Sequence, residues 1–203
     1  DFNFDKLVKL SNERNDIDSL FNTIIENIFN DINENNFKYV VIKADLNLYK
    51  VILANLHRNK ISKDCKLIII FRNYIEILNN DNEIEELLKM GISRGLDFGC
   101  YINDKMNTSL SKIFKYFNWL LIPPKYSDNI SSDKELFDKV QSILYFTKHY
   151  NLKLIANELV SYNDAKLLND LGVYFMSGPL IDERGDRDYE GKRKFKRLLS
   201  EEE

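Results

Sequence analysis

The chain has 203 residues, a length typical of one domain that buries a sizeable core. Hydrophobic residues make up 44% and charged residues 30%, values close to globular averages that exclude collagen-like, disordered and disulfide-stapled classes. The 29 basic and 32 acidic residues give a net charge of −3, which argues against a nucleic-acid polymer held by bulk charge. The cysteines, Cys65 and Cys100, fit a reducing compartment or plain burial. Because no apolar run reaches about 18 residues, we expect a cytoplasmic protein without membrane insertion.

The first half of the chain predicts helices and strands in alternation. Between residues 16 and 33, apolar side chains recur every three or four positions, as on a helix packed against a core. Two further stretches have helical spacing, and Gly95 is placed to end the second of them. The predicted helices cover residues 16–33, 46–59 and 83–94, and short apolar runs predict buried strands over 37–44, 66–71 and 96–102.

The second half continues this alternation. Its predicted helices cover residues 109–116, 134–150 and 164–171, and its predicted strands cover 119–122, 153–159 and 174–181. Pro123 and Pro124 end the first of these strands, since proline cannot donate to a sheet ladder. Gly172 closes the last helix. Residues 183–203 form a charged C-terminal tail in which a short helix over 192–199 is an open alternative.

Alternation of strand and helix predicts an α/β fold, with parallel strands joined by right-handed helical crossovers. The strands are continuous apolar runs, which indicates that both faces of the sheet are covered. A TIM-like barrel and an open doubly wound sheet both meet these conditions. No glycine-rich phosphate-binding motif follows any predicted strand. The barrel is therefore the favoured architecture.

The last third of the chain resembles the EAL domains, the cyclic-di-GMP phosphodiesterase barrels. Residues 156–161 read ANELVS where that family has A-E-G-V-E-T, and Gly172 follows at the family spacing. Ser177-Gly178 stands where the family has Q-G. Upstream segments over 41–45, 67–73, 95–110 and 118–123 occur in the order of the family's strand motifs. The resemblance implies a TIM-like (β/α) barrel of EAL type over residues 1–182, with its first strand missing from the chain.

The same resemblance implies that the hydrolytic machinery is replaced. Such enzymes bind one or two Mg²⁺ or Mn²⁺ ions that activate water, and these hard cations need carboxylate ligands. The family's metal-ligand and catalytic positions fall here on Ile70, Asn73, Tyr101, Ile102, Leu121, Pro123, Asn157, Val160 and Ser177. We therefore predict no catalytic residue, no metal site, no cofactor and no enzyme activity. An alternative alignment keeps Asp97 as a remnant carboxylate, but one aspartate cannot hold a two-metal centre.

A vestigial pocket is predicted at Lys43, Asn73, Asn157 and Ser177 by the same alignment. Other polar residues at or after strand ends, where barrel enzymes place their chemistry, are Asp45, Asn103, Asp104 and Glu158. A ligand-binding role and an ordinary polar strand end both remain open for them. His57 and His149 are expected to be exposed or capping residues, and the basic run over 192–197 a solvated tail.

Three functions follow from this interpretation. The first is a catalytically inactive EAL-like signalling module that acts through protein–protein interaction in a bacterial regulatory protein, with a protein partner or as a homodimer. The alternative is a cyclic-di-GMP receptor that binds without hydrolysis, and the third is a divergent metal-dependent phosphodiesterase. Aromatic residues such as Tyr145 and Tyr150 on predicted helices fit either core packing or an interface.

Overall fold

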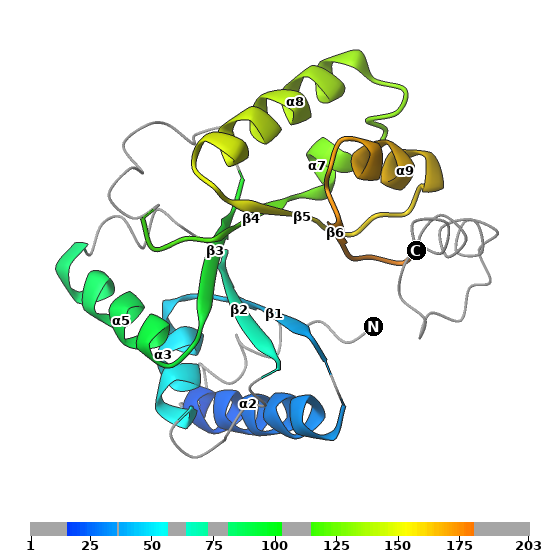
Figure 1. The fold of residues 1–203 in the computed structure, drawn as a ribbon. Helices are drawn as coiled ribbons and strands as arrows, with labels where there is room; N and C mark the ends of the chain where they lie inside the picture. The colour runs from blue at the N-terminus through cyan, green and yellow to red at the C-terminus, as the bar shows by residue number, and fades with distance from the viewer. Residues whose placement is uncertain (1–15, 36, 57–63, 73–80, 103–114, 181–203) are drawn as a thin grey trace. The chain divides into compact units, whose positions relative to one another are not determined.

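A computed structural model describes residues 16–35, 37–56, 64–72, 81–102 and 115–180. The chain forms two compact units, Asp1–Phe98 and Gly99–Glu203. The strands follow the order β1-β2-β3-β4-β5-β6 (Figure 1). Strand β3, Asp97–Tyr101, begins in the first unit and ends in the second. The α/β class predicted from the alternating pattern is confirmed.

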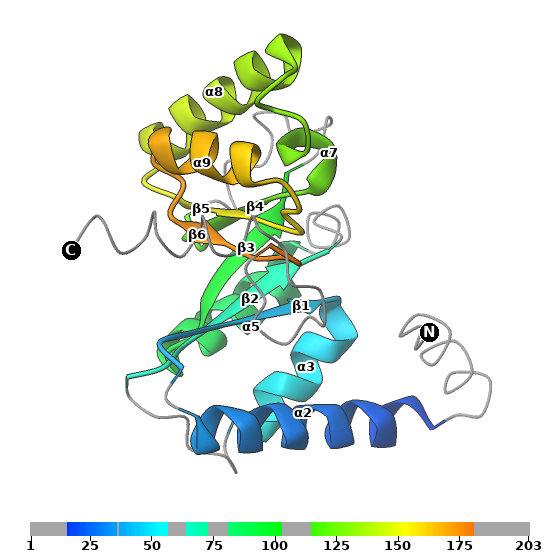
Figure 2. The same cartoon turned by 90° about the vertical axis from the view of Figure 1, so that its right-hand side faces the viewer.

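The first unit packs helices against two parallel strands. Its elements are α2 (Ile17–Glu34), β1 (Tyr39–Ala44), α3 (Leu46–Asn55), β2 (Lys66–Phe71) and α5 (Asp81–Ser93). Strands β1 and β2 pair in parallel, with Tyr39 beside Lys66 and Ala44 beside Phe71. Helices α2 and α3 lie on the same side of these two strands (Figure 2). Helix α2 buries the stripe Phe21, Ile25, Phe29 and Ile32, as its apolar spacing predicts.

Three aromatic rings form the centre of this unit. The ring centroid of Tyr49 lies 5.5 Å from that of Phe71 and 5.4 Å from that of Phe98, both edge-on. The Tyr49 hydroxyl donates a hydrogen bond to the Leu87 carbonyl, and burial raises the pKa of this phenol. Helix α5 approaches the rings at Gly91, where a Cβ would lie 2.5 Å from Phe98 Cζ and from the Tyr49 hydroxyl oxygen. The absence of a side chain at Gly91 is thus what lets the helix reach the core.

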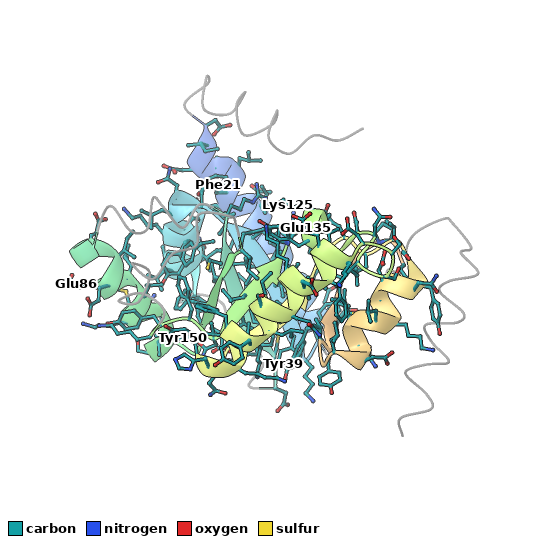
Figure 3. All side chains as sticks on the ribbon, turned by 90° about the horizontal axis from the view of Figure 1, so that it is seen from above. Phe21, Tyr39, Glu86, Lys125, Glu135 and Tyr150 are labelled. Carbon is teal, nitrogen blue, oxygen red and sulfur yellow. The ribbon has the colours of Figure 1, made fainter. Side chains whose placement is uncertain are left out.

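The second unit carries the remaining strands. Its elements are β4 (Trp119–Ile122), α7 (Pro124–Ser127), α8 (Lys134–His149), β5 (Lys153–Ala156), α9 (Tyr162–Asp170) and β6 (Phe175–Met176). Strand β4 pairs in parallel with β3 and with β5, and β5 with β6. Helices α7, α8 and α9 lie on one side of β4 and β5 (Figures 1 and 2), and Glu135 and Tyr150 mark the two ends of α8 in Figure 3. Trp119 is fully buried and meets the Phe175 ring edge-on at 4.7 Å.

Most predicted elements are confirmed, and the strands over 66–71 and 119–122 match to the residue. Strands β5 and β6 are shorter than the predicted 153–159 and 174–181. The backbone leaves the extended conformation at Glu158, with φ of 61°, and at Gly178, with φ of 136°. Helix α7 was not predicted; Pro124 opens it at a position that tolerates proline's missing N–H.

Some predicted elements lie wholly or partly outside the residues that the structure describes. The predicted helix over 109–116 lies mostly outside the described residues, and Lys115 and Tyr116 form a turn. The end of the helix predicted over 46–59 and the whole tail over 183–203 also lie outside them. Gly95 and Gly172 end α5 and α9 with φ near 90°, as predicted. Among the described helices, none has the length and apolar character needed to cross a bilayer.

Candidate functional site

Three polar residues meet where β5 and β6 end. Asn157 and Glu158 directly follow β5, and Ser177 directly follows β6. The Ser177 hydroxyl donates to Asn157 Oδ1 at 2.9 Å, and Asn157 Nδ2 donates to Glu158 Oε1 at 2.7 Å. Asn157 is only 4% exposed, so both ends of its amide are engaged inside the protein. We call Asn157, Glu158 and Ser177 the strand-end network.

The backbone around the strand-end network is fixed by an unusual close approach. Gly178 lies so near the β5 end that a Cβ on it would be 2.3 Å from the Leu159 nitrogen and 2.6 Å from the Glu158 carbonyl carbon. The Leu159 N–H donates to the Ser177 carbonyl at 3.0 Å, and the Ser177 N–H to the Ala156 carbonyl at 2.9 Å. Glu158 adopts the left-handed conformation that non-glycine residues rarely take. Strained backbone of this kind is concentrated at functional sites, which makes this end of the unit the candidate site.

The chemistry available to this network is limited. The Ser177 proton is directed to an amide oxygen, which is not a general base, so the contact does not activate Ser177 as a nucleophile. The amide group of Asn157 in turn occupies one oxygen of Glu158. The arrangement is therefore suited to presenting hydrogen-bonding groups in a fixed geometry.

Two more carboxylates lie close to the network. Asp164, in the first turn of α9, is 3% exposed and accepts hydrogen bonds from the backbone N–H groups of Asn129 at 3.0 Å and Ser131 at 2.8 Å. Burial raises the pKa of Asp128, and the nearby carboxylates of Asp164 and Glu158 raise it further. Asp164 thus fixes the backbone of the turn between α7 and α8 through two hydrogen bonds. It also adds a negative charge near Asp128, beside that of Glu158.

We expect Asp128→Asn to stabilise the protein at neutral pH. Because the folded-state pKa of Asp128 lies above its unfolded value, the ionised carboxyl opposes folding at neutral pH, and the free energy of unfolding rises as the pH falls through that folded-state pKa. The asparagine variant removes this cost, so its advantage should shrink toward acid pH. Urea denaturation at neutral and acid pH measures the difference. The exposed Asp138→Asn serves as the matched control; an equal gain from it would contradict the local origin of the effect.

The neighbouring strand ends are apolar. Leu121 is 1% exposed, and Ile122, which ends β4, is fully buried and followed by Pro123. At the end of β3, Tyr101 is half-buried and Ile102 is buried. Within the described ranges, no group of three or more His, Cys, Asp or Glu side chains is arranged to hold a metal ion.

The first unit places its predicted residues in structural roles. Asp45 accepts the Leu48 N–H at 2.8 Å and is the N-cap of α3, so its carboxylate is used at the start of the helix. Asp97 begins β3 and pairs with Lys66 at 3.1 Å, so it stands at the opposite end of its strand from where Asn157 stands on β5. Lys43 is half-buried near the end of β1.

Other predicted residues are either distant from the network or not described. His149 ends α8, is exposed and meets the Tyr150 ring edge-on. Val160 is 58% exposed. Asn73, Asn103, Asp104 and His57 lie outside the described residues. Sequence reasoning missed Asp128 and Asp164, although Ser161 and Asp164 have the spacing of a helix-capping motif.

Comparisons with known proteins connect this fold to one family of structures. No family model matches the sequence, and no curated protein sequence does. Solved structures of EAL domains do match. The Xanthomonas citri FimX EAL domain in complex with c-diGMP has a TM-score of 0.68 at 12% identity, over 92% of this chain and 78% of that one. The PaMucR phosphodiesterase in its c-di-GMP complex has a TM-score of 0.64 at 14% identity, over 86% and 74%.

A third match is the cGMP-bound form of the EAL enzyme Bd1971, with a TM-score of 0.62 at 14% identity. It covers 96% of this chain, which spans about half, 52%, of that longer one. The fold is therefore that of the EAL TIM-like barrels. The order of strands and helices favoured a TIM-like barrel, and the family resemblance implied its EAL type. At such low identity the likeness concerns the fold, and any activity must be argued from the residues.

Proposed function

We propose that this chain is a non-hydrolysing EAL-like module of bacterial cyclic-di-GMP signalling that acts through protein–protein contacts. The observation that supports it is the character of the strand ends in the second unit. Leu121, Pro123, Asn157 and Ser177 stand there, and metal-assisted hydrolysis would need carboxylate oxygens around the ions.

Two of the carboxylates that lie nearby, Asp164 and Glu158, already accept hydrogen bonds. Asp164 accepts two backbone N–H groups, and Glu158 accepts the Asn157 amide. A metal ion placed there would compete with these contacts for the carboxylate oxygens. This supports a role in which the fold is retained and the hydrolytic chemistry is not.

The test is hydrolysis of cyclic-di-GMP in the presence of Mg²⁺ or Mn²⁺. We expect no turnover above the rate without protein, under conditions in which an active EAL phosphodiesterase hydrolyses the nucleotide. Turnover that is abolished by Glu158→Gln or by Asp97→Asn would overturn the proposal and identify the carboxylate that matters. The exposed Glu135→Gln, on α8, is the matched control for a change of charge.

A second candidate function is binding of cyclic-di-GMP without hydrolysis. Two of the three structures named above are described as complexes with this dinucleotide. Asn157 and Ser177 offer hydrogen-bonding groups at the strand ends. Titration calorimetry in Mg²⁺ separates the two functions. Micromolar or tighter binding that weakens at least ~10-fold in Asn157→Leu, a loss of about 1.4 kcal/mol, would favour the receptor over the interaction module.

A further inference from the structure

The second unit carries basic and aromatic side chains at the edge where its parallel strands begin. Strands β4 and β5 start side by side, with Trp119 paired with Lys153, and the Lys153 N–H donates to the Asn118 carbonyl at 2.7 Å. The turn before β4 and the end of α8 therefore lie together at this edge. The side chains that they bring to it are Lys115, Tyr116, Lys148, His149, Tyr150 and Lys153. We call these residues the basic face.

Most of the basic face is open to solvent. Tyr116 is half-buried, and the other members are exposed. Tyr150, at the C-terminal end of α8 (Figure 3), is 41% exposed. Its ring centroid lies 4.6 Å from that of Phe146 and 4.9 Å from that of His149. Tyr145, about one turn before His149, is 78% exposed. Exposed clusters of aromatic side chains are typical of protein interfaces.

Charge is divided between the two ends of these strands. Residues 115–122 and 139–157 contain four lysines and no aspartate or glutamate, in a chain whose net charge is −3. Among the described residues of this unit, Asp170, at the end of α9, is the acidic one at the edge where the strands begin. Asp128 and Glu158 lie at the opposite end, where the strands finish. The basic face therefore attracts acidic groups locally, against the charge of the whole chain.

Two of the cations are positioned by aromatic rings. Lys115 Nζ lies 4.7 Å from the centroid of the Tyr116 ring, and Lys153 Nζ lies 4.8 Å from that of Trp119. Trp119 is fully buried, so its ring holds a defined orientation. An ammonium group that is already ordered loses less conformational entropy when it binds a carboxylate. The basic face thus presents these charges in a defined arrangement.

An acidic protein segment fits this surface better than a membrane or a nucleic acid. The large apolar side chains of Phe117 and Leu152, at the same edge, are buried, so little apolar surface is presented for insertion into lipid. The net charge of −3 opposes the binding of a long polyanion. A short acidic segment needs only a few cations, and the exposed aromatic rings give its other side chains a surface to pack on.

We propose that the basic face docks an acidic segment of a partner protein, whose carboxylates pair with Lys148 and Lys153 and whose other side chains pack on Tyr150. The proposal names the class of partner for the interaction function proposed above and rests on it. It is tested without nucleotide. A failure to bind acidic peptides would therefore leave the hydrolysis result unaffected, and turnover of cyclic-di-GMP would leave the peptide result unaffected.

The test is a selection of random-sequence peptides on the full 203-residue chain. Enriched peptides should carry an excess of aspartate and glutamate, and their affinity should fall as the salt concentration rises. Lys148→Gln combined with Lys153→Gln should weaken the binding of an enriched peptide about tenfold. The matched control combines Lys134→Gln with Lys166→Gln, which removes two exposed lysines from α8 and α9 and should leave the affinity unchanged.

Two further measurements accompany the selection. Circular dichroism shows whether both double variants are folded, and the salt dependence of the native chain tests the role of charge without any substitution. The native chain is also titrated with oligothymidylate and with phosphatidylglycerol vesicles, which we expect to bind more weakly than the peptides. No enrichment, enriched peptides without an acidic excess, an equal loss in the control, or tighter binding of the oligonucleotide or the vesicles would each overturn the proposal.

Discussion

Replacing Gly178 by alanine is expected to lower the free energy of unfolding by about 3–5 kcal/mol, because overpacking and backbone strain act together. The new Cβ would lie 2.3 Å from the Leu159 nitrogen, 2.6 Å from the Glu158 carbonyl carbon and 2.8 Å from the Glu158 Cα. These are backbone atoms, which cannot rotate away as a flexible side chain does. The φ of 136° adds strain for any residue with a side chain.

Gly172→Ala is the matched control in the same unit. Gly172 also has a positive φ, of 91°, but a Cβ there meets nothing closer than the Tyr174 hydroxyl at 4.0 Å. The Gly172→Ala substitution should therefore lower the free energy of unfolding only through the strained backbone conformation, by about 1–2 kcal/mol. Urea denaturation followed by circular dichroism measures both variants. Equal losses would show that the close approach at Gly178 contributes nothing.

The order of strands and helices could be read from the sequence because the pattern is local. The run KLIIIF over 66–71 is apolar at nearly every position, as a strand covered on both faces must be, and WLLI over 119–122 is the same. The stripe along α2 follows the helical period. Each of these elements buries the residues that its own spacing selects, so no distant contact is needed to predict it.

The ends of β5 and β6 could not be placed in the same way. LIANEL and YFMSGPL continue as plausible strand sequences, but the close passage of Gly178 past Glu158 stops both ladders. That passage is a contact between segments twenty residues apart. Periodicity along either segment carries no information about it, which is why the predicted strands are too long.

The candidate site, too, could be predicted only where its residues follow from a local sequence pattern. Parallel strands end at a common edge, so the residues after β5 and β6 were expected near each other, and Asn157 and Ser177 are indeed hydrogen-bonded. Asp128 and Asp164 belong to a turn and a helix that are brought together by tertiary packing. The positions of the strand ends in the sequence therefore do not predict that these two residues lie near the site. Asp45, for which a ligand-binding role and an ordinary polar strand end were both left open, uses its side chain locally to cap α3.

The similarity to EAL domains and the proposed loss of hydrolysis are compatible for a physical reason. The fold is maintained by buried apolar strands, whose requirement is size and hydrophobicity rather than particular residues. Metal-assisted hydrolysis depends on a few carboxylates at the strand ends, which contribute little to that core. At 12–14% identity the core can persist while those few positions change. The resemblance described under Sequence analysis implies that Leu121 and Pro123, at the end of β4, are such positions.

Asp164→Ala is expected to lower the free energy of unfolding by about 2–3 kcal/mol, because hydrogen bonds to a charged group contribute about 1.5–3 kcal/mol each and exposed donors recover part of that from water. The variant removes the acceptor of the Asn129 and Ser131 N–H groups, both of which belong to exposed residues. The turn between α7 and α8 should loosen. Hydrogen exchange at these two amides, followed by NMR, should become faster than in the native chain.

The matched control is Asp133→Ala, which removes the N-cap of α8. Asp133 accepts the Glu135 and Leu136 N–H groups but is exposed, so a loss of about 1 kcal/mol is expected. In Asp164→Ala the pKa of Asp128 should also fall, because one of the carboxylates that raise it has gone. If the pKa of Asp128 and the exchange rate of the Asn129 amide are both unchanged, Asp164 does not organise this turn. The geometry of the strand-end network would then depend on the close approach at Gly178 alone.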